Sequence, residues 1–251
     1  MGRVQGKVAL VTGGGQGLGK ADAVRLQEEG ASVVVTDLNK SNATSVAEMI
    51  GNGAVGLEHD VTSQESWSSV VAHIEDRFGR LDILVNNAGI LIPGTIESTS
   101  LEDFRTHLAV HVEGTFLGCQ SALPLMKKSG GGSIINMASV AALRGVGPYL
   151  AYTAAKGAIL SMNRAVAAHC QDEGNLIRCN TLAPAAAETP MFLTSIGEAV
   201  REPNVPEGVL PLGAAMSPTD VAHLVVYLAS DESRYITGGE FALDNGQIQR
   251  V

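Results

Sequence analysis

Short runs of apolar, mostly β-branched residues alternate with longer stretches of helical periodicity along this chain. Strands that are apolar almost throughout are buried on both faces of a sheet. The pattern predicts strands at 8–12, 32–36, 54–57, 82–85, 133–137, 177–182 and 240–243, and helices at 17–29, 42–50, 64–78, 101–126, 152–169 and 219–229. Such alternation gives a parallel sheet flanked by helices on both faces, so we expect one α/β, doubly wound, Rossmann-type domain over residues 1–251.

The stretch 185–218 interrupts this regular alternation and holds five of the nine prolines. A long irregular segment inside a compact domain usually serves as a lid or a binding loop. We therefore expect 185–218 to cover the functional site.

Composition narrows the classes of partner. The net charge is −9, which disfavours nucleic acid and anionic membranes as partners. No apolar run is long enough for a membrane span, and the N-terminus lacks a signal-peptide pattern. The three cysteines, Cys119, Cys170 and Cys179, have no CxxC spacing, so we expect no disulfide framework, no metal site and a cytoplasmic protein.

The first predicted strand runs into the glycine-rich segment TGGGQGLG, which opens the first helix. Gly13, Gly17 and Gly19 would let the backbone turn tightly and approach a pyrophosphate, which the helix N-terminus would attract. Gln16 and Leu18 complete the candidate cofactor contacts in this turn. An ordinary strand–helix turn is the alternative, but the position within a βαβ unit favours a dinucleotide site.

Asp37 follows the second predicted strand. A carboxylate there can accept hydrogen bonds from the adenosine ribose and would repel a 2′-phosphate, so NAD is favoured over NADP. Leu38, the next residue, is a further candidate contact. Two alternatives stay open: Asp37 could be a helix N-cap, and nearby Lys40 could serve a phosphate.

Ser139 follows a strand end, and the segment YTAAK places Tyr152 and Lys156 on one face of a helix. Tyrosine, with a pKa near ~10, is a poor base at neutral pH, but a neighbouring ammonium would favour its phenolate. A shift of three units needs about 4 kcal/mol, which one close cation in a partly dry cleft can supply. Tyr152 is then the candidate acid/base for hydride transfer, and Ser139 would hold the substrate oxygen.

Further motifs make the chain resemble the short-chain dehydrogenase/reductase family along nearly its full length. They are HDV at 59–61, NNAG at 86–89, NTLAPAAAETPM at 180–191 and a terminal ITGGEFALDNG. The resemblance implies that Tyr152 and Lys156 also contact the cofactor, Lys156 at the nicotinamide ribose. It further implies contacts from Asp60 and Val61 beside the adenine, from Asn87, Ala88 and Gly89 behind the cofactor, and from Pro184 and Thr189 in the loop that folds over it.

The chain departs from the family pattern at two positions. His111 stands where the catalytic tetrad usually has an asparagine, which is thought to kink the helix and hold a water in a proton relay. The histidine could bond a backbone carbonyl or titrate as part of the relay, or it could be a neutral, satisfied helix residue. Ala185 replaces a glycine after Pro184, which would strain the backbone if a positive φ were required there.

Several stretches resemble bacterial 3β/17β-hydroxysteroid dehydrogenases, among them VNNAGILIPGTIESTSLEDF and GGSIINMASVAAL. The resemblance implies a bulky, apolar alicyclic alcohol or ketone as substrate and a homotetramer. Uncharged residues form the expected pocket walls, which suits such a substrate. They are Leu91, Val140, Ala141, Leu143, Tyr149, Met191, Phe192, Leu193 and Ile196.

Two other functions fit the same motifs. A 3-oxoacyl carrier-protein reductase shares the fold and the Ser–Tyr–Lys set, but Asp37 and the acidic charge disfavour its usual NADPH and acidic carrier. A catalytically decayed NAD-binding scaffold is the alternative that His111 and Ala185 keep open. It would bind NAD without turning over any alcohol.

Overall fold

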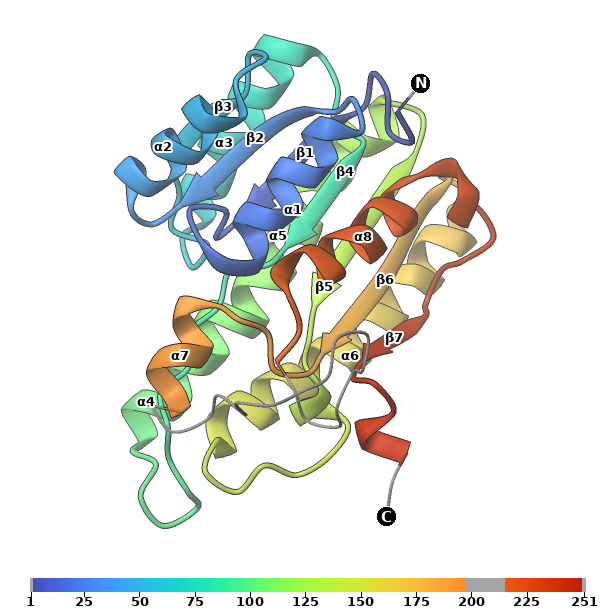
Figure 1. Cartoon of the computed structure of the whole chain (residues 1–251). Helices are drawn as coiled ribbons and strands as arrows, with labels where there is room; N and C mark the ends of the chain where they lie inside the picture. Colours follow the sequence, from blue (N-terminus) through green and yellow to red (C-terminus); the bar gives the residue numbers. More distant parts are fainter. Residues whose placement is uncertain (1, 197–214, 250–251) are drawn as a thin grey trace, which may run out of the picture.

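In the computed structural model, which describes residues 2–196 and 215–249, all seven strands pair in one parallel sheet of order β3-β2-β1-β4-β5-β6-β7 (Figure 1). The β-branched runs form these strands because both faces are covered by helices. The predicted fold class is confirmed. The strands are β1 (Val8–Thr12), β2 (Ser32–Asp37), β3 (Val55–Glu58), β4 (Ile83–Asn86), β5 (Gly132–Met137), β6 (Ile177–Pro184) and β7 (Glu240–Leu243).

Helices cover both faces of the sheet and bury separate apolar clusters against it. Leu26, Val46 and Val225 pack together on one face, and Trp67 and Met126 pack on the other. The first three come from α1 (Gly17–Glu28), α2 (Lys40–Ile50) and α8 (Pro218–Ala229). The other face holds α3 (Gln64–Phe78), α5 (Gly114–Lys128) and α6 (Leu150–Asp172), while α4 (Leu101–His107) and α7 (Pro190–Ile196) lie near the carboxyl end of the sheet (Figure 1).

The helix predicted over 101–126 is not continuous. A π-helical turn, Leu108–Glu113, separates α4 from α5. Such turns are rare and often mark functional sites. Apolar periodicity alone did not reveal this π-helical turn, because the hydrogen bonds of its side chains are made with residues that are distant in the sequence. The short helix α7 was not predicted either, and it occupies the described start of the expected lid, of which 197–214 lie outside the described residues.

The strand order reverses between β2 and β4, the two neighbours of β1. Loops at the carboxyl ends of these strands therefore leave in opposite directions and open a crevice, where ligands of open α/β sheets bind. The glycine turn follows β1, Asp37 ends β2, and Ser139 comes soon after β5. The topology thus brings the main sequence-predicted site residues to one edge of the sheet.

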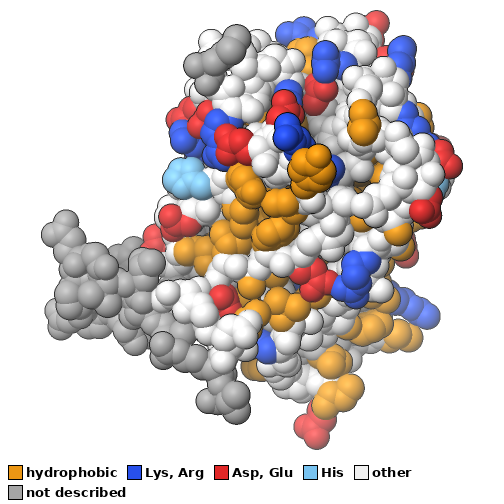
Figure 2. Space-filling model, turned by 90° about the vertical axis from the view of Figure 1, so that its right-hand side faces the viewer, with side chains coloured by type: hydrophobic (Ala, Val, Ile, Leu, Met, Phe, Trp, Pro, Cys, Tyr) orange, Lys and Arg blue, Asp and Glu red, His pale blue; other side chains and the backbone are white. Residues whose placement is uncertain are grey.

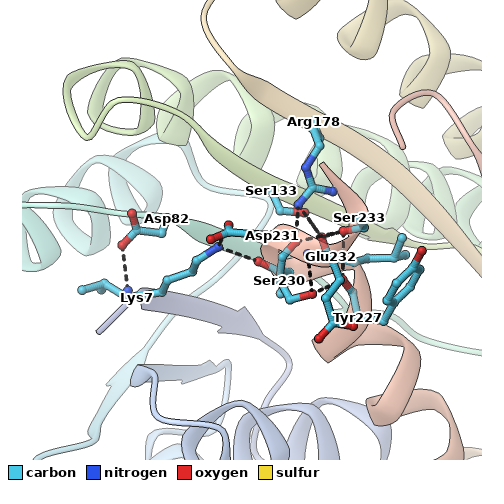
Figure 3. Close-up of polar contacts among 12 residues, drawn as sticks. Lys7, Asp82, Ser133, Arg178, Tyr227, Ser230, Asp231, Glu232 and Ser233 are labelled. Atoms are coloured by element: carbon cyan, nitrogen blue, oxygen red, sulfur yellow. Dashed lines mark hydrogen bonds and ion pairs between the residues drawn. The ribbon is translucent and has the colours of Figure 1, made fainter. Parts of the chain in front are cut away.

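A polar cluster fixes the C-terminal end of α8 (Figure 3). The Leu228 carbonyl accepts from Ser133 Oγ at 2.7 Å and from Arg178 Nη2 at 2.7 Å. Lys7 Nζ donates to the Ala229 carbonyl at 3.1 Å and pairs with Asp231. These donors satisfy carbonyls that a helix C-terminus leaves free, and the cations complement its dipole. This cluster is a structural anchor for α8.

Candidate active site

The turn after β1 leaves a backbone cradle that side chains would fill. Gly13 and Gly17 have φ values of +60° and +55°, which favour glycine. A β-carbon on Gly13 would lie 2.7 Å from the Cα of Ala88. Asn87 Nδ2 donates to the carbonyls of Thr12 at 2.9 Å and Gly13 at 3.1 Å, which ties the NNAG segment to the turn. This open backbone at the start of α1 fits the pyrophosphate of a dinucleotide.

Asp37 faces the same turn. Its Oδ2 accepts from the Gly15 amide at 3.0 Å, and its Oδ1 accepts from the Asn39 amide at 3.0 Å. The N-cap of α2 is Asn39, whose side chain accepts from two amides of the helix, so the N-cap alternative for Asp37 is wrong. Leu38 beside it is 70% exposed, as a residue that packs on a bound base could be.

The segment after β3 lies against Asp37. The His59 amide donates to the Asp37 carbonyl at 2.9 Å, and the His59 ring bonds Thr36 Oγ1 at 3.0 Å. Burial lowers the pKa of His59 to about 4, so this ring is neutral at physiological pH. Asp60 follows with its carboxylate turned to Thr62. The HDV motif indicates this segment, but it does not reveal that His59 stabilises β2 through its hydrogen bonds to Thr36 and Asp37.

Ser139, Tyr152 and Lys156 come together between β5 and α6. Ser139 lies beside the Tyr152 hydroxyl and favours its ionised form. Lys156 Nζ lies 5.5 Å from the centroid of the Tyr152 ring and donates to the Met137 carbonyl at 2.6 Å. The three side chains thus form one polar group at the carboxyl edge of the sheet, next to the glycine turn.

The protonation of this group differs from the expectation. Burial raises the pKa of Tyr152, although the neighbouring Ser139 side chain opposes the rise. Burial also lowers the pKa of Lys156 to about 7. The expected lowering of the Tyr152 pKa by the Lys156 ammonium is therefore not found in the protein alone, because both groups are desolvated and the ammonium is bonded to a backbone carbonyl.

Comparison with known proteins places this site in a family. A family profile described as "Enoyl-(Acyl carrier protein) reductase" matches residues 13–247. A 3-beta-hydroxysteroid dehydrogenase of Comamonas testosteroni is 41% identical over 97% of this chain and 96% of its own length. The 2,5-dichloro-2,5-cyclohexadiene-1,4-diol dehydrogenase LinX of Sphingobium indicum is 39% identical over 97% of each chain.

Among solved structures, a 3-ketoacyl-(acyl-carrier-protein) reductase from Brucella melitensis, complexed with NADH, superposes with a TM-score of 0.87 at 32% identity, covering 98% of this chain and 99% of that one. The chain belongs to the short-chain dehydrogenase/reductase family. Close relatives act on secondary alcohols as dehydrogenases, so this short-chain dehydrogenase/reductase has the scaffold of an oxidoreductase.

The first family departure, His111, lies in the π-helical turn and is buried. Its Nε2 is 2.9 Å from the Ile90 carbonyl oxygen, and its Nδ1 has no partner among the described residues. Burial lowers the pKa of His111 well below its usual value, and the charge of Lys156 lowers it further. The ring is therefore neutral but only half satisfied, which disfavours a titrating role.

The second departure, Ala185, causes no backbone strain. The non-glycine residues with positive φ among those described are Asn52, Leu176 and Asn245, so Ala185 does not need the glycine conformation. Its amide donates to the Leu243 carbonyl at 2.9 Å, which continues the pairing of β6 with β7. The expected difficulty with closed-loop geometry at this residue is therefore not found.

Thr189 lies over the glycine turn. A β-carbon on Gly17 would be 3.3 Å from Thr189 Cγ2. Beside it opens a cavity of about 250 Å³ between the glycine turn, the segment after β4 and α7. Leu91 and Met191 line it as expected, and Pro93, Pro190, Thr194 and Gln16 line it too. Of the other expected pocket residues, Val140 and Ala141 are buried, and the side chain of Ile196 lies outside the described residues.

Proposed function

We propose that this chain is an NAD-dependent oxidoreductase that interconverts a bulky apolar secondary alcohol and its ketone. The observation that carries the proposal is the group formed by Ser139, Tyr152 and Lys156 beside the glycine cradle. When bound, the nicotinamide supplies the hydride acceptor or donor. Ser139 lies beside the Tyr152 hydroxyl, so a substrate oxygen placed against both would meet a proton carrier and a positioning hydroxyl.

Because the Tyr152 phenol is neutral, it is ready to donate a proton in ketone reduction but not to accept one in alcohol oxidation. In ketone reduction, Tyr152 donates the proton that it already carries to the oxygen that receives charge. In alcohol oxidation, Tyr152 must first lose that proton before it accepts one from the alcohol. Lys156 favours the phenolate only while its ammonium is charged, which its pKa of about 7 allows at and below neutral pH.

The preference for NAD is proposed from Asp37. Both carboxylate oxygens are oriented by backbone amides of the glycine turn and the α2 N-cap. A fixed negative charge at that position favours a free ribose hydroxyl and disfavours a 2′-phosphate. Asp60, Val61, Asn87, Gly89 and Pro184 remain proposed cofactor contacts on the strength of the family resemblance and of their place around the crevice.

The substrate class is proposed from the cavity and from relatives. Leu91, Pro93, Pro190 and Met191 give the cavity a mainly apolar wall, with Gln16 and Thr194 as its polar members. Such a lining suits an alicyclic alcohol with few polar groups. Relatives named for hydroxysteroids and for a cyclic diol agree with this class.

The deciding experiment is steady-state turnover of steroid, cyclic and small secondary alcohols with NAD and with NADP. We expect turnover of a cyclic or steroid alcohol with NAD, lost by at least about a thousandfold in Tyr152→Phe because the proton carrier is removed. Tyr235→Phe is the matched control, because Tyr235 is 91% exposed. NADH binding without turnover, unaltered by Tyr152→Phe, would instead support the decayed scaffold. A preference for NADPH and acyl thioesters would support the carrier-protein reductase.

We also propose a homotetramer. The edge strand β7 pairs with β6 alone among the described strands, and its free edge offers backbone groups to which a second copy could bind. Figure 2 views the molecule from the β7 side and shows hydrophobic side chains gathered across this face. Light scattering of the full chain tests the proposal, which a monomer at micromolar concentration would contradict.

No helix among the described residues is long and apolar enough to cross a bilayer.

A further inference from the structure

His107 is a second buried histidine beside the site, and sequence reasoning did not single it out. It ends α4 and is fully buried. Its Nδ1 lies 2.8 Å from the Asp103 carbonyl, and its Nε2 lies 3.2 Å from the Ile92 amide nitrogen. A carbonyl only accepts and an amide only donates, so Nδ1 carries the proton and Nε2 is the acceptor. These two contacts fix the ring in one neutral tautomer.

His107 and His111 hold the same segment. The two residues lie one helical turn apart, and their rings stack with centroids 5.9 Å apart and planes inclined by 17°. His111 contacts the backbone of Ile90, and His107 contacts that of Ile92. The residue between the two held positions is Leu91, which lines the cavity. The segment after β4 is therefore fixed by two side chains of the helix rather than by pairing within a sheet.

The pair is also linked to the acid/base. The Tyr152 ring meets both histidines edge to face, with centroids 5.4 Å from His111 and 6.5 Å from His107. A change in the position of the histidine rings would therefore reach both the cavity wall and the packing of Tyr152. Because His107 makes its hydrogen bond to Ile92 rather than to Tyr152, its main effect should be on the wall.

We propose that His107 is a positioning residue that sets Leu91 in the substrate cavity, acting as one half of a two-histidine clamp on the segment 90–92. This rests on the proposed function, in which the cavity receives the apolar body of the alcohol. The clamp affects how a bulky substrate fits and leaves the proton carried by Tyr152 unchanged. Loss of His107 should thus raise KM more than it lowers kcat.

The test compares His107→Gln, His107→Asn and His107→Leu in the full chain. The Gln side chain reaches as far as Nε2 of the histidine and can accept from the Ile92 amide. The Asn side chain reaches only as far as Nδ1, and the Leu side chain has no hydrogen-bonding group. Loss of one neutral hydrogen bond should raise KM for a bulky alcohol about five- to tenfold in the Asn and Leu variants. We expect the Gln variant to stay within about twofold of the wild type, and kcat within about threefold in all three.

Hydrogen exchange at the Ile92 amide gives a readout that needs no substrate. We expect this amide to exchange several-fold faster in the Asn and Leu variants, and at the wild-type rate in the Gln variant. Equal exchange in all variants, or a Gln variant that behaves like Leu in both measurements, would overturn the clamp. If the Leu variant does not fold, the Gln–Asn comparison still decides. If no alcohol is turned over, the proposed function fails, while the exchange rates still decide whether the clamp exists.

Discussion

Nε2 of His111 lies 3.2 Å from the amide nitrogen of Ile90 and 2.9 Å from its carbonyl oxygen. One ring nitrogen can accept from the amide or donate to the carbonyl, but it cannot do both. The imidazole therefore always leaves one of the two backbone groups without its partner. The side-chain amide of glutamine reaches as far as Nε2 and carries a donor and an acceptor side by side, so it could satisfy both.

The first prediction follows for His111→Gln. We expect the variant to keep kcat/KM within about threefold of the wild type and to gain about 1 kcal/mol in unfolding free energy from the additional hydrogen bond. Steady-state kinetics and urea unfolding measure the two effects. A loss of activity of about a hundredfold or more would show instead that the imidazole has a chemical role that an amide cannot replace.

Gly89 and His111 should be coupled. A β-carbon on Gly89 would lie 2.6 Å from Cε1 of the His111 ring, and the three nearest atoms all belong to that ring. We expect Gly89→Ala to cost about 1–3 kcal/mol in the wild type through overpacking. In the His111→Asn background the cost should fall by at least about 1 kcal/mol, which a double-mutant cycle of unfolding free energies measures. Additive effects would contradict this contact.

Asp37 should set the choice of cofactor. We expect Asp37→Ala to relax the preference for NAD, since the charge that repels a 2′-phosphate is lost. Asp37→Asn is the matched variant, because it keeps a hydrogen-bond acceptor and removes the charge alone. The ratio of kcat/KM with NAD to that with NADP measures the effect in each. If Asp37→Ala still rejects NADP, the assigned role of Asp37 is wrong.

Asp22 should make stability depend on pH. This carboxyl is fully buried in α1, and neither oxygen has a hydrogen-bond partner among the described residues. Burial raises the pKa of Asp22 well above its usual value, so below that raised pKa the folded group is neutral, whereas the unfolded group is ionised above about pH 4. Unfolding then releases a proton, and the contribution of Asp22 to stability falls as pH rises from about 4 to the folded pKa.

Asp22→Asn has no proton to release. Its unfolding free energy relative to the wild type should therefore increase with pH, by up to about 1.4 kcal/mol per pH unit between the unfolded and folded pKa values. Urea unfolding at pH 4.5 and at pH 8 measures this difference. The same difference at both pH values would mean that Asp22 is ionised in the folded protein.

Arg178 should matter for stability but not for chemistry. Its Nη2 donates to the carbonyls of Leu228 at 2.7 Å and Ser230 at 3.2 Å, at the far end of α8 from the site. Arg178→Met should cost about 1.5–3 kcal/mol because the carbonyls of Leu228 and Ser230 lose a charged donor, although serine hydroxyls still donate to both. Arg178→Lys keeps the positive charge but not the several N–H donors of the guanidinium, so we expect an intermediate loss of unfolding free energy. A large change in kcat with unchanged stability would contradict a purely structural role.

The sequence was informative where the signal is local. Strand β1 and the turn that holds Gly13 and Gly17 could be located because a buried strand, a glycine pattern and a helix follow one another directly. The strand bounds of the structure lie within two residues of the predicted ones. Tyr152 and Lys156 could be paired because helical spacing alone puts them on one face.

The remaining features depend on contacts between distant segments. Lys156 bonds the Met137 carbonyl across the gap between α6 and β5, so its effect on Tyr152 could not be judged from spacing. In the sequence His107 is one of many positions on the apolar face of a helix, and only its contact with the Ile92 amide distinguishes it. Asp22 lies one turn before Leu26 on the buried face of α1, but no local signal shows that its carboxyl has no hydrogen-bond partner among the described residues. In each case a tertiary neighbour decides the chemistry.

The reversal of strand order at β1 also divides the chain into two halves with separate tasks. The proposed contacts of the adenosine end, Asp37 and Asp60, precede β4, whereas the residues proposed for the reacting end, Leu91, Ser139, Tyr152 and Met191, follow it. A crossover between homologous genes at β4 would therefore exchange substrate range while leaving dinucleotide choice intact. Evolution and protein engineering could vary the two specificities independently on this scaffold.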